Sequence, residues 1–564
     1  MKRFKFTAKM SSKFFAGFLV ALPVFFLFRT VSLGPISGFN GRGSGATRLS
    51  SSEERGVQYA TQLTADPEIS VPQFPSSKNR SSRFTNTRIP KDKLLGGLIS
   101  PGFDENSCLS RYKSNLYRKT SPHKPSAFLI SKLRNYENLH KHCGPNTESY
   151  NKALKQLISG NVSSSGECKY IVWIAYSGLG NRILSMTSAF LYALLTNRVL
   201  LIDQKPEMAD LFCEPFPNSS WLLPMDFPSR DQFNDFDQHF AQSYGNMLKY
   251  DGIDTSSEEL SVSYVYLHLA HDSDNHDNLF FCDNDQIFLR KIPWLFLKTD
   301  NYFVPALFRI PFFREVLSQL FPNKETVFHH LGRYLFHPTN EVWGLITRYY
   351  QAYLAKANEK IGIQIRVFNT LTTPSQLVMD QILSCTLNEN LLPEVDRLKI
   401  LPAEDQAKNR VSKAVLITSL YSKYFENMKD MYRKHPTVTG EVIGIYQPSH
   451  EEHQKTEDNL HNMKAWAEMN LLSMCDVLIT SAWSTFGYVA QGLAGIRPWV
   501  LYRIENRKAP DTACGQVMSM EPCFHSPPIH KCKAKTLYED NSAILPYYIR
   551  HCEDVRRGLK LFNQ

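Results

Sequence analysis

The stretch "KYIVWIAYSGLGNRILSMTSAFLYALLTNRVLLID", residues 169 to 203, decides the fold class. Its first run, "KYIVWIAY", is short and rich in β-branched and aromatic residues, which predicts a buried strand. "SGLGNR" then predicts a tight turn, "RILSMTSAFLYALLTNR" a helix and "VLLID" the next strand. This strand-helix-strand order, with a glycine turn at the first crossing, indicates a parallel sheet in an α/β protein.

The second half of the chain repeats the same rhythm. Further strand candidates are "KIGIQIRVF" (360–368), "KAVLITS" (413–419), "EVIGIYQ" (441–447), "CDVLITS" (475–481) and "RPWVLY" (497–502), with helical stretches between most of them. The segment 458–474 predicts a helix whose core face carries Leu460, Met463, Ala467, Leu471 and Met474. We therefore expect two doubly wound α/β domains, in which ligands bind at the carboxyl ends of the strands.

The N-terminal part of the chain differs in composition from the rest. An apolar run from Phe14 to Phe28 lies between Lys13 and Arg29, and residues 34–90 are rich in Ser, Gly, Thr, Arg and Pro. We expect a cytosolic tail at 1–13, a transmembrane signal anchor at 14–33 and a flexible stem at 34–90. A cleavable signal peptide is the alternative for the apolar run. Both interpretations place the remainder of the chain in the secretory lumen.

The basic net charge belongs to this N-terminal part. The chain carries a net charge of +10, and residues 1–50 contain eight Lys and Arg with no Asp or Glu, so 10 − 8 leaves +2 for the rest. A nearly neutral globular part argues against nucleic-acid binding. We expect this part to divide into an acceptor-side half, 91–340, and a nucleotide-side half, 341–564.

Sequons and cysteines agree with a lumenal location. Sequons place candidate glycans on Asn79, Asn161 and Asn218. None of the eleven cysteines forms a CxxC pair, which favours scattered disulfides over a zinc site. Because the total is odd, one thiol stays free, and Cys475 within an apolar segment is the candidate. The C-terminal cysteines are the candidates for disulfides: Cys514, Cys523, Cys532 and Cys552.

A phosphate site is predicted where the strand 475–481 gives way to "TSAWSTFGYVAQGLAG". If a helix begins near Ser484 or Thr485, its free N–H groups and the nearby hydroxyls suit a phosphate; a plain N-cap is the alternative for Ser484. Arg366 ends an otherwise apolar strand, where a cation needs an anion. An arginine and a helix N-terminus together can neutralise a pyrophosphate without a metal. A structural ion pair is the alternative for Arg366.

Two polar stretches are weaker candidates for the same ligand. The turn "SGLGNR" places Asn181 and Arg182 at a sheet crossing, where they contact substrate or simply complete a turn. His461, Lys464 and Glu468 form a stripe along the 458–474 helix, which is either a solvated face or a nucleotide contact.

Several carboxylates are candidates for binding a metal ion or for acting as a general base. "HDSDNHD" (271–277) and "CDND" (282–285) each contain a D-x-D, a pattern that holds a divalent metal in many nucleotide-sugar enzymes, but acidic loops are common. His268, His271 and His276 lack the spacing of a zinc site. Asp300 follows an apolar strand and is a candidate general base, with a turn-forming Asx residue as the alternative.

Six blocks, in order, resemble the plant xyloglucan fucosyltransferase family, the Golgi α-1,2-fucosyltransferases that use GDP-fucose. The resemblance covers essentially the whole chain from Asp92 onward. The blocks are "DKLLGGLISPGFDENSCLSRYKSNLYRK" (92–119), "SGLGNRILSMTSAFLYALLTNRVLLID" (177–203), "FLKTDNYFVP" (296–305), "IGIQIRVF" (361–368), "HNMKAWAEMNLLSMCDVLITSAWSTFGYVAQGLAG" (461–495) and "EPCFH" (521–525).

The resemblance implies a GT-B fold of two Rossmann-like domains facing a cleft, and a Golgi type II membrane protein that inverts the anomeric centre without a metal or other cofactor. Arg366 would bind the diphosphate, and Asp300 would lie near the acceptor hydroxyl. The other donor-site residues it implies are Asn181, Arg182, His461, Ser484, Thr485, Phe486 and Gly487. The acceptor would be a galactosyl or arabinosyl unit of a wall polysaccharide or arabinogalactan-protein glycan.

Two other functions stay open: a non-catalytic glycan-binding or scaffold protein, and a metal-dependent glycosyltransferase that uses a D-x-D loop. A glycosidase would need two carboxylates flanking one sugar site, and no such pair stands at the predicted strand ends. The sequence leaves homodimerisation open.

Overall fold

The computed structural model describes residues 92–160, 167–228, 230–255, 262–401, 411–528, 532 and 545–563. Residues from Thr87 to Gln564 form one compact unit. The predicted tail, anchor and stem, together with Asn79 and Asn161, lie outside the described residues. Within the described ranges, none of the helices has both the length and the apolar composition that a membrane span requires.

The first sheet is parallel and confirms the strand-helix-strand unit predicted for 169–203. Its order is β2-β1-β4-β3. Tyr170 pairs with Val199 on one side and with Trp294 on the other. The helix that crosses from β1 to β2 is α4, Leu179–Thr196. The strands are β1 (Tyr170–Ile174), β2 (Val199–Asp203), β3 (Tyr264–His268) and β4 (Trp294–Lys298).

The second sheet contains the five strands predicted in the second half of the chain and one that was not predicted. Its order is β10-β9-β8-β5-β6-β7, parallel except for β10. The strands are β5 (Glu359–Gln364), β6 (Lys413–Thr418), β7 (Ile443–Tyr446), β8 (Val477–Ser481), β9 (Trp499–Leu501) and β10 (Cys514–Gln516). A separate hairpin joins β11 (Ile549–His551) to β12 (Leu559–Leu561).

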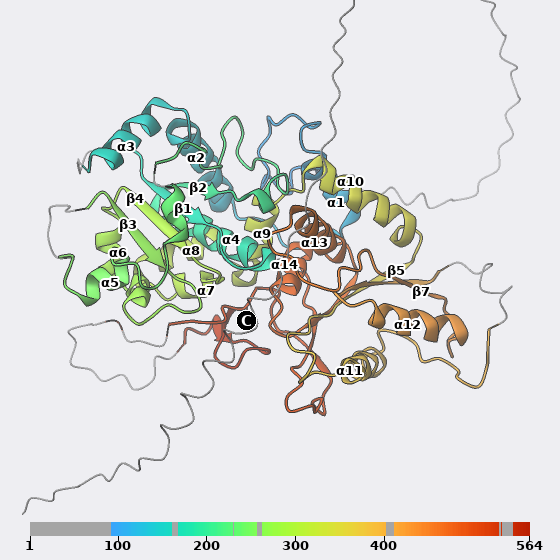
Figure 1. Cartoon of the computed structure of the whole chain (residues 1–564). Helices are drawn as coiled ribbons and strands as arrows, with labels where there is room; N and C mark the ends of the chain where they lie inside the picture. The colour runs from blue at the N-terminus through green and yellow to red at the C-terminus, as the bar shows by residue number, and fades with distance from the viewer. Residues whose placement is uncertain are drawn as a thin grey trace, which may run out of the picture. The chain divides into compact units, whose positions relative to one another are not determined.

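Helices lie outside both sheets and between them (Figure 1). In the central layer, α14 packs against each of the three helices α4, α9 and α13. The helices other than α4 are α1 (Leu109–Tyr117), α2 (Ala127–Cys143), α3 (Glu148–Ser159), α5 (Tyr244–Lys249), α6 (Asp283–Leu289), α7 (Val304–Leu307), α8 (Pro311–Leu320), α9 (Val327–Leu335), α10 (Asn340–Tyr349), α11 (Ser375–Asn388), α12 (Lys423–Lys434), α13 (Asn459–Leu472) and α14 (Thr485–Ala494).

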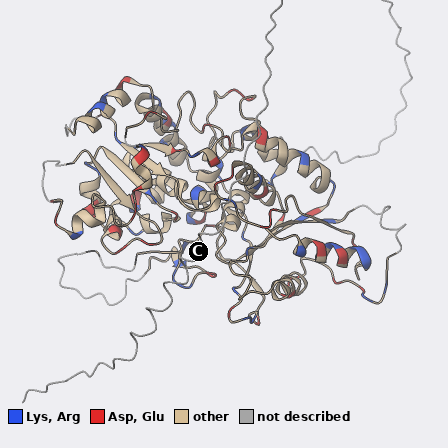
Figure 2. Ribbon diagram, viewed as in Figure 1, with Lys and Arg blue, Asp and Glu red and all other residues tan. Residues whose placement is uncertain are grey.

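Charged residues are more frequent on the peripheral helix α12 than on the strands of the first sheet. Figure 2 shows mixed blue and red segments on the peripheral helix α12, whereas the strands of the first sheet are mostly tan. Burying an unpaired charge costs free energy, so the surface helix α12 is rich in charge, whereas buried charged residues such as Arg182 and Glu207 form an ion pair.

Helix α13 corrects the predicted amphipathic face. Met463, Ala467, Leu471 and Met474 are buried as expected, but Leu460 is 57% exposed because it lies in the first helical turn, at the edge of the layer. Polar residues of α13 are also buried, among them Glu468 and Asn470. The helix is therefore enclosed on most sides and has no single core face.

Five disulfides tie distant segments together: Cys108–Cys213, Cys143–Cys168, Cys282–Cys532, Cys385–Cys514 and Cys523–Cys552. All four C-terminal cysteines singled out in the sequence take part. Cys475 is the free, buried thiol among the described residues, as predicted.

The segment after the second sheet packs back against the first half of the chain. Tyr302 Oη donates to Oε2 of Glu521 at 2.6 Å, and the backbone N–H of Phe328 donates to Oε1 at 2.7 Å. Near the other end of the unit, α1 packs on α10. The two predicted halves of the chain, 91–340 and 341–564, therefore pack against each other through these segments.

The N-termini of α4 and α14 meet at a glycine. A Cβ atom at Gly180 would lie 2.7 Å from Oγ1 of Thr485 and 3.0 Å from the backbone nitrogen of Phe486. Oγ1 of Thr485 also donates to Oδ1 of Asn181 at 2.7 Å. The glycine turn of "SGLGNR" is therefore required by close packing between two helices that are far apart in sequence.

Substituting this glycine tests the helix contact. Gly180→Ala forces a methyl group into the backbone of α14, which should destabilise the domain by about 1–3 kcal/mol. Gly344→Ala on α10 is the matched control, since its Cβ would meet no atom within 4 Å. Because alanine is the better helix former, this control should be neutral or stabilising by up to about 1 kcal/mol. Thermal unfolding compares the two, and equal midpoints would contradict the tight contact.

Candidate functional site

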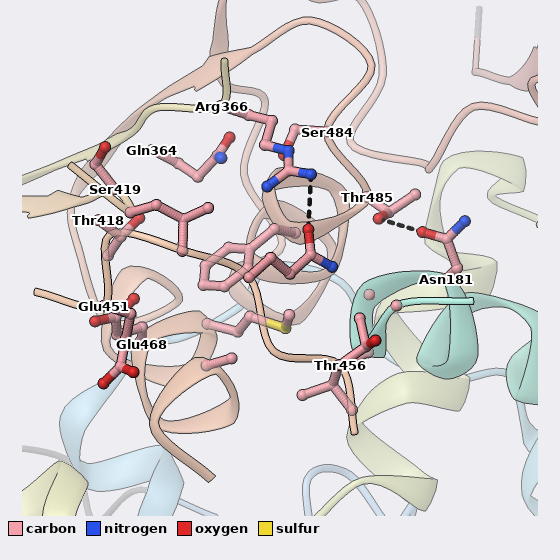
Figure 3. A pocket seen from close by; sticks show the side chains of 18 of the residues that line it. Asn181, Gln364, Arg366, Thr418, Ser419, Glu451, Thr456, Glu468, Ser484 and Thr485 are labelled. Carbon is pink, nitrogen blue, oxygen red and sulfur yellow. Dashed lines mark hydrogen bonds between the residues drawn. The ribbon is translucent and has the colours of Figure 1, made fainter. Parts of the chain in front are cut away.

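A cavity of about 380 Å³ lies where loops from both sheets meet α13 and the first turns of α4 and α14. In the second sheet the strand order reverses between β5 and β8. Arg366 follows β5, and Ser484 follows β8. Ligands of doubly wound sheets bind at such a reversal, at the carboxyl ends of the strands. Figure 3 shows Arg366 and Ser484 close together on one side of this cavity.

The first turn of α14 supplies unpaired N–H groups. Ser484 is the N-cap, and its side chain makes no capping hydrogen bond. The first N–H groups of a helix have no carbonyl partner within the helix, and they carry the positive end of its dipole. Ser484, Thr485 and Phe486 line the cavity, as predicted. Gly487 lies against β8 instead, since a Cβ there would be 2.9 Å from Cβ of Thr480.

Arg366 presents its guanidinium to the cavity without a carboxylate partner among the described residues. Its Nη2 donates to Oε1 of Gln454 at 2.7 Å, and its backbone N–H donates to Oγ of Ser481 at 2.9 Å. Burial lowers the pKa of Arg366. The alternative, a structural ion pair of Arg366 with a carboxylate, is not formed among the described residues. A partly buried cation beside a helix N-terminus is suited to an anionic ligand.

A second helix N-terminus faces the same cavity. The turn before α4 and its first residues, 177–181, line the wall opposite α13. Asn181 therefore lies where the sequence predicted it. Arg182 does not line the cavity: Nη1 pairs with Glu207 at 3.1 Å, and Nε donates to the carbonyl of Ser177 at 2.8 Å. These bonds hold the turn in place, and Ser177 adopts a φ of 65° within it.

The far end of the cavity is acidic. Glu451 and Glu468 lie together, across the cavity from Asn181 and Thr485 (Figure 3). Burial raises the pKa of Glu468 to about 8, and Oγ of Ser449 donates to its Oε1. Lys464 donates to Glu451 and lowers the pKa of that carboxyl group.

The polar stripe of α13 faces the cavity rather than solvent. His461, Lys464 and Glu468 are all among its lining residues. Thr418 also lines it, and Oγ1 of Thr418 is buried without a hydrogen-bond partner among the described residues. Buried polar atoms without partners are rare in folded proteins, so this hydroxyl is a candidate for a hydrogen bond with a ligand.

Asp300 stands outside the lining of this cavity, at the end of β4 in the first sheet. Its Oδ1 accepts from the backbone N–H of His271 at 3.0 Å, and its Oδ2 lies 2.6 Å from Nδ1 of His271. Both carboxylate oxygens are therefore engaged by one histidine. As a general base, Asp300 stays a prediction.

The carboxylates of the two D-x-D stretches are engaged by hydrogen bonds and ion pairs within the protein. Oδ1 of Asp274 accepts from the backbone N–H groups of His276 and Asp277, and Oδ1 of Asp285 accepts from Oη of Tyr244 at 2.7 Å. Asp272 pairs with His268. The carboxylates of these stretches do not line the cavity.

Several lining residues were not predicted. Gln454 and Thr456 come from the loop before α13, Trp483 precedes the N-cap of α14, and His525 comes from the C-terminal segment. No local pattern distinguishes them, because long-range packing brings them to the cavity. For His525 the only signal was its presence in the block "EPCFH".

Comparison with known proteins identifies relatives along most of the chain. A sequence model described as "Xyloglucan fucosyltransferase" matches residues 70–533. A galactoside 2-alpha-L-fucosyltransferase of Arabidopsis thaliana is 60% identical over 501 residues, covering 87% of this chain and 88% of the relative, and one of Pisum sativum is 59% identical over 483 residues, covering 86% and 84%. The solved structure of a mutant of Arabidopsis thaliana FUT1 in complex with GDP is 61% identical, with a TM-score of 0.76, and the match covers 83% of this chain and all of that chain.

The family match spans most of the chain and includes every element that lines the cavity. The chain therefore belongs to the xyloglucan fucosyltransferase family.

Proposed function

We propose that this enzyme transfers L-fucose from GDP-β-L-fucose to O2 of a galactosyl residue, with inversion at the fucosyl carbon and without a metal ion. Its relatives are named galactoside 2-alpha-L-fucosyltransferases, and the similar solved structure is a GDP complex. One observation carries the proposal: Arg366, without a carboxylate partner in the described part of the chain, faces a cavity beside the first turn of α14.

The reaction is a single displacement. The acceptor O2 forms a bond to the fucosyl C1 while the bond from C1 to the β-phosphate oxygen breaks, and GDP leaves with that electron pair. Negative charge grows on the diphosphate during this step. The guanidinium of Arg366 and the N–H groups of the first turn of α14 stabilise that charge in place, without reorganisation. The N-terminus of α4 adds a second positive dipole end.

The acidic end of the cavity suits the guanine base. Guanine presents two adjacent donor groups, N1–H and the 2-amino group, and a carboxylate can accept from both at once. Glu468 lies across the cavity from the phosphate side, and the lining also includes Thr418, whose hydroxyl has no hydrogen-bond partner among the described residues. In this orientation the diphosphate reaches Arg366, and the fucosyl unit lies toward Asn181 and the first sheet.

The wider context is also part of the proposal. The two main sheets act as the Rossmann-like domains of a GT-B enzyme, and the chain is a single-pass type II protein of the Golgi membrane. The acceptor belongs to a wall polysaccharide or an arabinogalactan-protein glycan. The D-x-D carboxylates bond to other protein groups and do not line the cavity, which supports a mechanism without a metal.

A transfer assay tests the function. The lumenal part of the chain should move labelled fucose from GDP-fucose onto galactose-ended glycans and release GDP, and the rate should be unchanged by EDTA. Arabinose-ended glycans in the same panel establish the acceptor. Binding of glycans without GDP release would favour a scaffold protein, and loss of transfer in EDTA would favour a metal-dependent enzyme.

Arg366→Ala tests the diphosphate site. Loss of charge-assisted hydrogen bonds should weaken GDP binding at least about 100-fold and abolish transfer. The fold should be retained, because no described carboxylate depends on this arginine. Calorimetric titration with GDP and thermal unfolding measure both properties.

Arg182→Ala is the matched comparison for Arg366. It leaves the buried carboxylate of Glu207 unpaired, so its main effect should be on the unfolding midpoint. An Arg366→Ala enzyme that still transfers fucose would overturn the phosphate assignment.

Glu468→Gln tests the guanine contact. Because the pKa of Glu468 is raised to about 8, the ionised form that accepts two hydrogen bonds becomes populated as pH rises through that value. GDP affinity should therefore rise between about pH 7 and 8.5 in the unsubstituted enzyme and stay flat in the variant. Inosine diphosphate lacks the 2-amino group and should bind about 10-fold more weakly than GDP.

The same pair of ligands gives the control. In Glu468→Gln the preference for GDP over inosine diphosphate should largely disappear. An unchanged preference would assign guanine recognition to another group.

A further inference from the structure

A hydrogen-bonded cluster lies beside the phosphate side of the cavity. Trp483 has a φ of 63°, which is unusual for a residue with a large side chain. Its backbone N–H donates to Oδ2 of Asp554 at 3.1 Å, and its indole Nε1–H donates to the carbonyl oxygen of the same residue. The guanidinium of Arg503 lies 4.3 Å from the centre of the indole ring. Trp483 is thus held in a strained conformation from both sides.

The same carboxylate reaches a histidine of the cavity wall through a tyrosine. Oη of Tyr488 donates to Oδ2 of Asp554, and Nε2 of His525 lies 3.1 Å from the same Oη. An ionised carboxylate only accepts, so the hydroxyl proton points to Asp554 and the hydroxyl oxygen accepts from His525. Nε2 of His525 therefore carries the proton, and Nδ1 carries the lone pair.

The free nitrogen of His525 is available to a ligand. His525 lines the cavity together with Trp483 and Ser484. Within the described residues, no hydrogen bond is made by its Nδ1. Burial lowers the pKa of His525, while the carboxylates of Asp554 and Asp300 oppose that shift. The ring is accordingly neutral near pH 7, and two carboxylates are placed to stabilise it once it gains a proton.

A purely structural role does not explain the cluster. Oδ1 of Asp554 is buried and has no hydrogen-bond partner among the described residues, which costs stability. The strained backbone of Trp483 adds a further cost of about 1–3 kcal/mol. Costs of this kind are typical of functional sites. Cys523 lies two residues before His525, and Cys552 lies two residues before Asp554. A disulfide joins these two cysteines, so the segments that carry His525 and Asp554 are fixed relative to each other.

We propose that Nδ1 of His525 takes the proton of the acceptor hydroxyl, directly or through one water, and that Tyr488 and Asp554 are positioning residues that fix its tautomer. The inference rests on the proposed fucosyl transfer. As the new bond from acceptor oxygen to C1 forms and GDP leaves, the acceptor O–H bond breaks and its proton passes to Nδ1. The resulting imidazolium is stabilised by Tyr488 and Asp554 and then loses its proton to solvent. This is the usual task of a general base.

His525→Gln is the direct test. GDP affinity should stay within about 2-fold, whereas kcat should fall about 100- to 10,000-fold. In the unsubstituted enzyme kcat should fall as pH drops below the pKa of the histidine in the complex, and this acid limb should vanish in the variant. Tyr488→Phe should retain the histidine but lower kcat about 10-fold and shift the acid limb, because the link to Asp554 is lost.

Two other histidines serve as comparisons. His551 lies in the β11–β12 hairpin and bonds to the carbonyl of Gly558, so His551→Gln should leave kcat unchanged and show that the segment tolerates substitution. His271→Gln should keep the acid limb. Loss of that limb in His271→Gln, or its persistence in His525→Gln, would overturn the inference and favour the pair of His271 and Asp300.

The failure of this inference and of the proposed function are distinct results. If the unsubstituted enzyme transfers fucose and His525→Gln transfers it equally fast, only the role of His525 is wrong. If GDP binds but no galactoside acceptor is fucosylated by the unsubstituted enzyme, the proposed function itself fails, and with it the inference.

Discussion

The close approach of α4 to α14 at Gly180 is the constraint on which the rest of the site depends. Two strand-to-helix turns, one from each sheet, meet at Thr485, so both positive helix ends face one cavity. A side chain at position 180 would separate them. Since helix dipoles act only near the helix end, a small separation would weaken their combined effect on an anion. The packing of these two helix ends therefore determines how strongly the cavity can hold an anion.

Around this contact, positively charged groups and carboxylates lie on opposite sides of the cavity. The cation Arg366 and the free N–H groups lie on one side, and the carboxylates of Glu451 and Glu468 lie on the other (Figure 3). A nucleoside diphosphate has the opposite pattern, with anionic phosphates at one end and hydrogen-bond donors on a guanine at the other. Complementarity of this kind fixes the orientation of a ligand as well as its affinity.

Local patterns predicted the parts of the fold that local physics controls. The buried strands, the glycine turn and the roles of Arg366, Ser484 and Asn181 as cavity residues followed from apolar runs and strand-end rules. Leu460 was placed wrongly because periodicity does not reveal which end of a helix leaves the core. The position of His525 at the cavity depends on the Cys523–Cys552 bond and on packing between distant segments, which no short pattern encodes.

The Cys523–Cys552 bond also has a consequence for biosynthesis. The residues that it fixes follow both sheets in the sequence, so they are synthesised after both sheets. One wall of the cavity is then completed only when this segment has docked and its thiols have been oxidised. Maturation of the enzyme therefore requires an oxidising environment, and a chain held under reducing conditions would have its sheets but an incomplete cavity.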